Sequence, residues 1–189
     1  YPHYGGVESH VLGLALNLQQ RGHTVDVLTS RYARMPKRET VRGLPVRRVT
    51  QWLNLFNTPI APGFAKDIAT TEADVVHVHS PPPFTEFFAA RGAQKAGKPL
   101  VITYHCDLEL RGRLGSLMVR GYQRFLGNQP LQRAEHIIST TESYAATSRA
   151  LWNRDIKVVP NAVDTEQFHP SNFGGHIRER LAPDNEPLA

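Results

Sequence analysis

Cysteine is nearly absent from this sequence of 189 residues, in which Cys106 is the single thiol. An internal disulfide framework is therefore excluded, and the composition is typical of a protein in a reducing compartment, so we expect a cytoplasmic location. The sequence also lacks a run of about 18 apolar residues, the length that a membrane-spanning helix needs. Hydrophobic residues nevertheless make up 40% of the chain, which is enough for a packed core.

Acidic side chains are scarce in two segments of this chain, whose net charge is +5. Residues 31–48 contain one acid, Glu39, and residues 110–134 contain none. Such segments attract nucleic acid, acidic lipid or phosphorylated substrates, or else form a solvated basic face without a partner. Because no aromatic platform or known reader motif accompanies them, we expect no nucleic-acid partner. Their basic residues are Arg31, Arg34, Lys37, Arg38, Arg42, Arg47 and Arg48, then Arg111, Arg113, Arg120, Arg124 and Arg133.

Two hydrophobic periodicities alternate along the chain. A helical stripe that Gly22 ends consists of Val7, Val11, Leu14 and Leu18. Short apolar runs predict strands at 23–29, 73–80, 98–105, 134–141 and 156–163, and a strand pair turning at Gly43. Helical segments between them are expected near 61–71, 84–97, 113–127 and 142–151. This alternation predicts an α/β fold with a doubly wound, mostly parallel sheet.

Two glycines, Gly5 and Gly6, directly precede the first helix. They permit close approach of a ligand to the helix N-terminus, where unpaired N–H groups lie. They do not form a G-x-G-x-x-G motif, so a dinucleotide fingerprint is not supported. Glu8, in the first helical turn, would repel a phosphate seated there. It either accepts a hydrogen bond from a sugar or polyol hydroxyl, or merely stabilises the helix start.

Histidines gather at the carboxyl ends of the expected strands, where ligands of doubly wound sheets bind. His77 and His79 face the same side of one strand, and His105 follows the next. These three are a conceivable zinc set, but no Cys, Asp or Glu completes a recognised ligand spacing. Strand histidines that are buried commonly bond to the backbone instead, and we expect no metal here.

The segment after the third strand offers further polar groups. His105 and Asp107 either bind substrate or act as an acid–base pair. Cys106 between them is a candidate nucleophile. Strand alternation turns it away from His105, however, so we expect Cys106 to pack at the strand end.

The expected helix over 113–127 is amphipathic. Arg113, Arg120 and Arg124 form one stripe beside a broad apolar sector. A helix of this kind lies on anionic lipid, or it packs against the core with a wet basic edge. The apolar sector consists of Leu114, Leu117, Met118, Tyr122, Phe125 and Leu126.

Five segments in the same order and spacing resemble the N-terminal domain of GT-B-fold glycosyltransferases of family 4. The resemblance covers about residues 4–170, and the matching segments are GGVESHVLGLALNLQQRGHTVDVLT, DVVHVHSP, PLVITYHCD, AEHIISTTES and IKVVPNAVDTEQFHP. It implies a Rossmann-like acceptor-side domain over residues 1–160, and over residues 161–189 a linker with the start of a donor-binding domain. It also implies a first strand before residue 1, in the middle of the sheet. Because that strand and the donor-binding domain lie outside the sequence, we expect the chain by itself to be inactive.

The resemblance implies a retaining glycosyltransferase. The donor would be a UDP- or GDP-linked sugar, the acceptor a hydroxyl of a lipid-linked, phospholipid or polysaccharide molecule, and no metal would be required. The basic helix adds the expectation of peripheral binding to the inner membrane face. The alternative is a non-catalytic nucleotide- or anion-binding Rossmann-like module.

The resemblance also carries residue roles onto matching positions. It implies that Gly5 and Gly6 form a loop facing donor and acceptor, with Glu8 and His10 at its helical edge. His105 would be the catalytic histidine beside the transferring sugar. The other implied roles are acceptor or sugar contacts for His79 and Asp107, and the interdomain crossover for Asn161 and Asp164.

Overall fold

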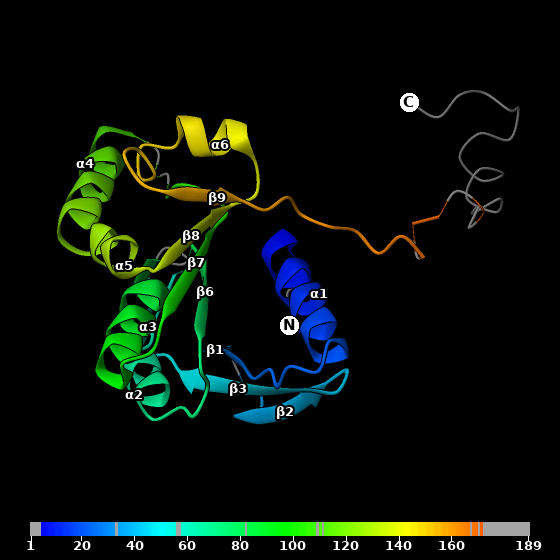
Figure 1. The fold of residues 1–189 in the computed structure, drawn as a ribbon. Coiled ribbons are helices and arrows are strands. Elements are labelled where there is room, and N and C mark those ends of the chain that lie inside the picture. Colours follow the sequence, from blue (N-terminus) through cyan, green and yellow to red (C-terminus); the bar gives the residue numbers. More distant parts are fainter. Residues whose placement is uncertain are drawn as a thin grey trace, which may run out of the picture.

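The computed structural model of the protein describes residues 5–32, 34–55, 58–81, 83–108, 110, 112–166, 168, 169 and 171. Its largest sheet is parallel and has the strand order β6–β7–β8–β9 (Figure 1). These strands span Val76–Ser80, Leu100–Tyr104, His136–Ser139 and Ile156–Val158. The parallel order with helices between the strands confirms the predicted α/β, Rossmann-like fold class.

A second sheet contains the strands nearest the N-terminus. β1 (Val27–Arg31) pairs in parallel with β3 (Leu44–Thr50), and β3 pairs in antiparallel fashion with β2 (Arg38–Val41). The turn between β2 and β3 contains Gly43, as predicted. A third, two-stranded sheet, β4 (Leu53–Leu55) with β5 (Thr58–Ile60), was not predicted. The sheets are divided between β1 and β6, where the resemblance puts a strand from before residue 1, and that strand stays a prediction.

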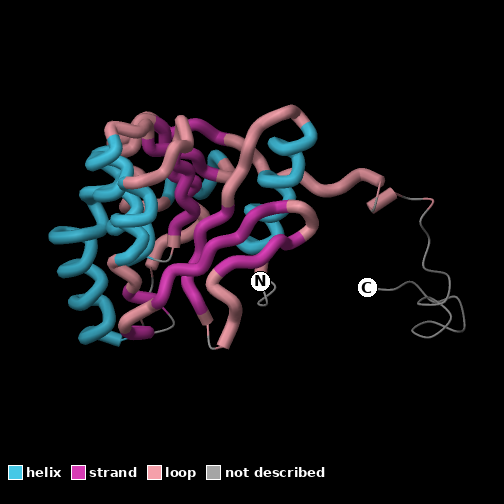
Figure 2. The backbone as a smooth tube through the Cα atoms, turned by 90° about the horizontal axis from the view of Figure 1, so that it is seen from below, coloured by secondary structure: helices cyan, strands magenta, loops and turns pink. Residues whose placement is uncertain are grey.

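Helices lie on both sides of the strands. α2 (Gly63–Ala69), α3 (Pro83–Ala96) and α5 (Asn128–Arg133) lie on one side, and α1 (Gly6–Gln20) lies on the other (Figures 1 and 2). α6 (Glu142–Thr147) follows β8 and lies near β9 (Figure 1). The main core is formed by small and branched apolar side chains between α3 and the parallel sheet, among them Val76, Val78, Ala89, Ala90, Ala93, Leu100, Ile102 and Ile137.

Several element boundaries differ from the predicted ones. The strand expected over 23–29 begins only at Val27, because the preceding residues terminate α1. The N–H groups of Gly22 and His23 donate to Gln19 and Leu18, and Gly22 adopts a φ of +88° that favours glycine. The last strand ends at Val158, and residues 159–164 leave the sheet as an extended segment.

The helix expected over 113–127 is divided into an α-helix and a π-helical turn, and a further short α-helix follows directly. α4 (Gly112–Tyr122) passes through a π-helical turn (Gln123–Gly127) into α5. Gly127 is buried there, and a Cβ on it would lie 2.8 Å from the Tyr122 ring. The π-turn therefore coincides with tight packing around Tyr122, which a helical periodicity does not reveal.

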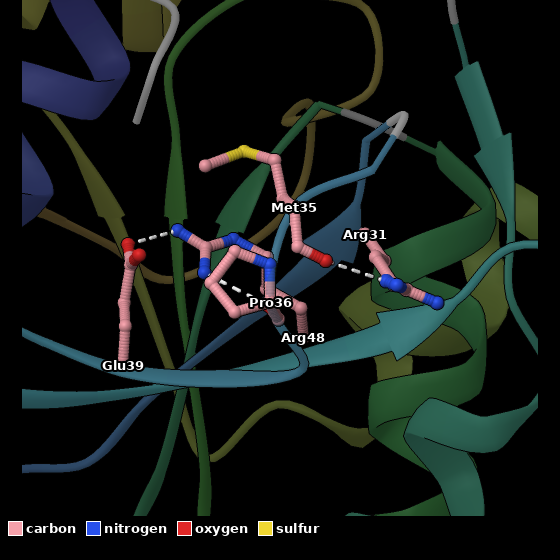
Figure 3. A network of polar contacts seen from close by, with 5 residues as sticks. All are labelled: Arg31, Met35, Pro36, Glu39 and Arg48. Atoms are coloured by element: carbon pink, nitrogen blue, oxygen red, sulfur yellow. Dashed lines mark hydrogen bonds and ion pairs between the residues drawn. The ribbon is translucent and has the colours of Figure 1, made fainter.

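The basic segment 31–48 is partly an internal structure. The side chain of Arg48 is only 1% exposed; it pairs with Glu39 and donates to the carbonyl oxygen of Pro36 at 3.2 Å (Figure 3). Arg31 donates to the carbonyl oxygen of Met35 at 2.7 Å. A buried guanidinium needs such partners because its desolvation is costly. The expectation of a solvated or ligand-binding basic side chain is therefore wrong for Arg48, while Arg31 is half-buried.

Within the part of the chain that the structure describes, no helix combines the length and apolar character needed to cross a bilayer.

Close packing of α2 and α3 generates a stability prediction. A Cβ at Gly92 of α3 would lie 2.8 Å from both the Ala65 carbonyl oxygen and Ile68 Cβ of α2. Gly92→Ala should therefore lower the free energy of unfolding by about 1–3 kcal/mol through overpacking, although alanine favours helix. Urea denaturation of the protein and its variant measures the change.

Gly121→Ala is the matched control, because Gly121 lies in α4 with no atom within 4 Å of its added Cβ. This variant should keep or raise the stability, by up to about 1 kcal/mol. Equal effects of the two substitutions would contradict the steric account.

Candidate functional site

Polar residues at the ends of β6 and β7 form the base of the candidate site. In the parallel register His79 lies beside Thr103, and Ser80 lies beside Tyr104. The N–H of His105 then donates to the Ser80 carbonyl oxygen at 2.9 Å, extending the pairing one residue beyond β7. His79 and His105 are therefore brought to the same edge of the sheet, as the sequence predicted.

A third histidine reaches this edge from α1. The His10 ring lies 5.4 Å from the ring of His79 and 5.2 Å from that of His105, measured between centroids. His79 Nδ1 lies 3.1 Å from His105 Nε2, a hydrogen-bonding distance. We call His10, His79 and His105 the three-histidine cluster; all three are half-buried.

The zinc set considered from the sequence had a different third member. His77 shares its face of β6 with His79 and stacks on it at 4.6 Å, but its Nε2 lies 2.8 Å from Thr103 Oγ1. The structure gathers donor atoms from His10 instead, because α1 brings the His10 ring to 5.4 Å from that of His79. Sequence spacing could not reveal this, since His10 is far from the other two along the chain.

The surroundings of His79 and His105 disfavour protonation of these two rings. Burial, together with the nearby imidazoles of His77, His105 and His10, lowers the pKa of His79 to about 3. Burial and the His10 ring also lower the pKa of His105. Desolvation disfavours the charged form of an imidazole, and neighbouring imidazoles oppose a second proton. At neutral pH these two rings therefore each offer one N–H donor and one nitrogen lone pair.

The helix that carries His10, α1, begins at the two glycines. Gly5 is the extended residue before the helix, and a Cβ on it would collide with Glu8 Oε2. Gly6, by contrast, has open space around the position of a Cβ. The Glu8 carboxylate thus folds back toward the helix N-terminus, where it is exposed. A carboxylate in this place disfavours a phosphate on the same N–H groups and suits a hydroxyl donor.

Asp107 has internal partners. The hydroxyls of Tyr104 and Ser148 donate to its Oδ1 at 3.0 and 2.7 Å. The acid–base pairing of Asp107 with His105 considered from the sequence is not the arrangement found, because the His105 ring bonds to His79. The carboxylate instead ties the segment after β7 to the residues that follow α6.

Cys106 and the crossover residues lie outside the cluster. Cys106 is exposed, so the expectation that it packs at the strand end is wrong; the chain is no longer a strand there. Asn161 and Asp164 lie in the exposed segment that leaves the sheet after β9 (Figure 1). The Asp164 carboxylate accepts from the N–H of Glu166 at 3.0 Å. Their roles in an interdomain crossover stay predictions.

A buried carboxyl behind the site was missed from the sequence. Glu86, in the first turn of α3, is 4% exposed, and the Tyr122 hydroxyl lies 3.0 Å from its Oε1. Burial raises the pKa of Glu86 to about 7, although hydrogen bonds from Ser80 and Tyr122 act in the opposite direction. An acid in a first helical turn is usually exposed. Glu86 is buried through its contact with Tyr122, which is distant in the sequence, so no local pattern could have predicted the burial.

Comparison with known proteins identifies the family. The sequence profile of Glycosyltransferase Family 4 matches residues 4–167, and the chain belongs to this family. Similar curated proteins include a subunit of the phosphatidylinositol N-acetylglucosaminyltransferase of Homo sapiens, 29% identical over 93% of this chain. Another is the GPI3 subunit of the same transferase from Saccharomyces cerevisiae strain RM11-1a, 27% identical over 97% of this chain.

A bacterial relative carries a different name. The GDP-mannose:cellobiosyl-diphosphopolyprenol alpha-mannosyltransferase of Xanthomonas oryzae pv. oryzae is 25% identical over 89% of this chain. The chain spans 37% of the length of the human relative, 42% of the yeast one and 45% of the bacterial one.

Glu86 makes stability depend on pH. Its carboxyl has a pKa near 7 in the fold, against 4.5 ordinarily, so the folded state binds the proton more tightly. Stability from this group is complete below about pH 4.5 and is lost as the pH rises toward 7. Glu86→Gln should remove this loss and raise the free energy of unfolding at pH 8 by about 2–3 kcal/mol relative to the wild type.

Urea denaturation of the protein at a series of pH values measures this effect. Glu142→Gln serves as control, because Glu142 is an exposed acid in the first turn of α6. It should leave the pH profile unchanged. A Glu86→Gln profile parallel to that of the wild type would show that the carboxyl does not titrate in this range.

Proposed function

We propose that the complete enzyme is a retaining glycosyltransferase that moves a sugar from a UDP- or GDP-linked donor to a hydroxyl of a lipid-linked acceptor. The family match over residues 4–167 carries this proposal. The site supports it, because the helix that begins at the two glycines carries His10, whose ring lies 5.2 Å from that of His105 at the strand ends. Within this proposal residues 1–160 form the acceptor-side domain, and residues 161–189 lead into a donor-binding domain.

His105 suits a place beside the sugar that is transferred. Breaking the bond to the diphosphate develops positive charge on the sugar ring, as in other glycosyl transfers. A cationic imidazolium nearby would oppose that charge. The lowered pKa of His105 keeps its ring neutral, so the ring can hydrogen-bond to a sugar hydroxyl without electrostatic cost. We therefore assign His105 to a contact with the donor sugar near the reacting carbon.

The start of α1 has two proposed contacts. Gly5 and Gly6 provide a surface without side chains that the donor diphosphate can approach from across the cleft. Glu8, which folds back toward the helix N-terminus, would accept hydrogen bonds from acceptor hydroxyls. His79 would contact the acceptor or the sugar from the same polar surface. Asp107 would act there from the segment after β7, which the bond from the Tyr104 hydroxyl holds in place. Fixed hydrogen-bonding groups and closure of the two domains would stabilise the transition state of the transfer. We propose that transfer needs no metal.

The lipid part of the acceptor is supported by the outer face of α4. Its apolar side chains project into solvent: Leu114 is 72% exposed, Leu117 65%, and Phe125 in the following π-turn 68%. The side chains of Arg113, Arg120 and Arg124 are exposed beside them. These exposures speak against the alternative in which the apolar sector packs against the core.

The inner side of α4 is anchored through Tyr122. Its hydroxyl lies 2.9 Å from the Pro83 carbonyl oxygen and 3.0 Å from Glu86 Oε1, and its ring contacts Phe84. The helix is thus held to the domain while its exposed apolar side chains remain accessible for contact with a lipid. An exposed apolar face with adjacent arginines suits an anionic bilayer surface. Acceptors named for the relatives, phosphatidylinositol and a diphosphopolyprenol, are lipids, and we propose that this enzyme works at the inner membrane face.

The role of His105 is tested by His105→Ala in the complete enzyme. We expect kcat to fall by about 100-fold or more, the size of effect found when a positioned catalytic group is lost. Initial rates at saturating donor and acceptor measure it. Cys106→Ser is the neighbouring control and should keep kcat near that of the wild type, which would also dismiss a cysteine nucleophile. Near-normal kcat of His105→Ala would contradict the assignment.

The membrane role of α4 is tested by Leu114→Ser combined with Leu117→Ser. Binding of the complete enzyme to vesicles that contain anionic lipid should weaken at least tenfold, because a loss of about 1.4 kcal/mol of binding free energy already weakens binding tenfold. Each buried leucine is worth about 1.5–3 kcal/mol. Co-sedimentation measures the bound fraction at low and high salt.

Val75→Ser is the control, since Val75 is an exposed apolar residue before β6 and outside α4. It should leave binding unchanged, and added salt should weaken binding of the wild type because the arginines contribute. Equal binding by the leucine double variant and the wild type would favour an acceptor that is not in a membrane.

A further inference from the structure

The three-histidine cluster has the geometry of a metal site. Its members come from three elements: His10 from α1, His79 from β6, and His105 from the segment after β7. One ring nitrogen of each lies within 4.8 Å of the others, and the closest two, His79 Nδ1 and His105 Nε2, are 3.1 Å apart. No proposed step of sugar transfer uses three imidazoles at one point.

These distances match what a small transition-metal ion requires. Zinc binds imidazole nitrogens at about 2.0–2.1 Å in tetrahedral sites, which puts neighbouring ligand nitrogens about 3.4 Å apart. The closest pair is already near this separation, and the His10 nitrogen, within 4.8 Å of the other two, would have to move closer on binding. Three protein ligands with a fourth position open is the arrangement of zinc sites that also bind a small molecule.

The neighbouring groups favour coordination over a purely packed cluster. The facing nitrogens of His79 and His105 lie at hydrogen-bonding distance, so one of them holds a lone pair that points into the cluster. The single hydrogen now shared between them would shift to the other nitrogen of its own ring through water. Both rings would then bind as neutral ligands without net loss of a proton. The His77 ring stacks on His79 and is held by Thr103, which limits the movement of the ligand.

We propose that His10, His79 and His105 bind one Zn²⁺ ion, and that the bound ion blocks sugar transfer. The second half rests on the proposed function, in which His105 contacts the donor sugar. An ion held by the His105 nitrogen removes that ring from the sugar. It also places positive charge beside a centre where positive charge develops, which raises the barrier of the reaction. Zinc is thus an inhibitor here and not a cofactor.

Direct binding tests the site independently of activity. The complete enzyme, without an affinity tag and stripped of metal by chelator, is titrated with Zn²⁺ by calorimetry. Co²⁺ then serves as a spectroscopic probe, since its visible absorption reports imidazole coordination. We expect about one ion per chain. His10→Ala should weaken binding by more than about 100-fold, because loss of even an outer-shell partner costs about 10–100-fold.

His23→Ala is the matched control, because His23 is an exposed histidine outside the cluster. It should bind Zn²⁺ as the wild type does. Absence of binding by the wild type would overturn the site, and so would equal binding by wild type and His10→Ala. Unchanged circular dichroism and urea denaturation of His10→Ala would show that its loss of binding is not loss of fold.

Kinetics separate the two halves of the proposal. Transfer should proceed in excess chelator, decline as free Zn²⁺ is raised, and recover when chelator is restored. Each variant is compared with its own rate in chelator, and His10→Ala should need at least about tenfold more Zn²⁺ for half inhibition. Zinc binding without inhibition would overturn the blocking step alone. A protein that binds zinc at the cluster but transfers no sugar would refute the proposed function and leave the metal site standing.

Discussion

Parallel pairing of β6 with β7 is the constraint on which the candidate site depends. It sets Ser80 beside Tyr104, and the N–H of His105 extends the ladder by one bond to Ser80. The imidazoles of His79 and His105 then lie on the same face of neighbouring strands, offset by two residues along the strands. A shift of one residue in this register would reverse the side chains of β7 and would separate the ends of the strands. Packing of Val78 and Ile102 in the core enforces the observed register.

Elements with strong periodicity could be predicted from the sequence. Short apolar runs indicated the parallel strands, and a helical stripe indicated the helix that Gly22 ends, because burial on one or both faces dictates those patterns. The glycine at position 43 indicated the hairpin. The β4–β5 pair could not be predicted in this way. Strands of three residues carry too few side chains to display a period, and their pairing depends on the surroundings. Helix and strand ends shifted because local capping bonds decide them.

The candidate site was predicted as to place but not as to geometry. Strand ends drew attention to His79, His105 and Asp107, since parallel strands present their carboxyl ends to ligands. What the side chains do there depends on residues distant in sequence. The Ser148 hydroxyl donates to Asp107, and the Tyr122 hydroxyl donates to Glu86. Such contacts arise from tertiary packing, for which a single sequence offers no spacing rule.

The basic segment over residues 31–48 has a structural effect that does not depend on a ligand. β2 is the outer strand of its sheet, so one side of its backbone lacks a neighbouring strand within the described residues. Arg38 stands exposed on this strand, while the buried Arg48 pairs with Glu39 and so holds the strand in place. Charged side chains on a short outer strand oppose pairing with the edge of another molecule. The exposed charge of Arg38 therefore disfavours pairing of this edge with another strand.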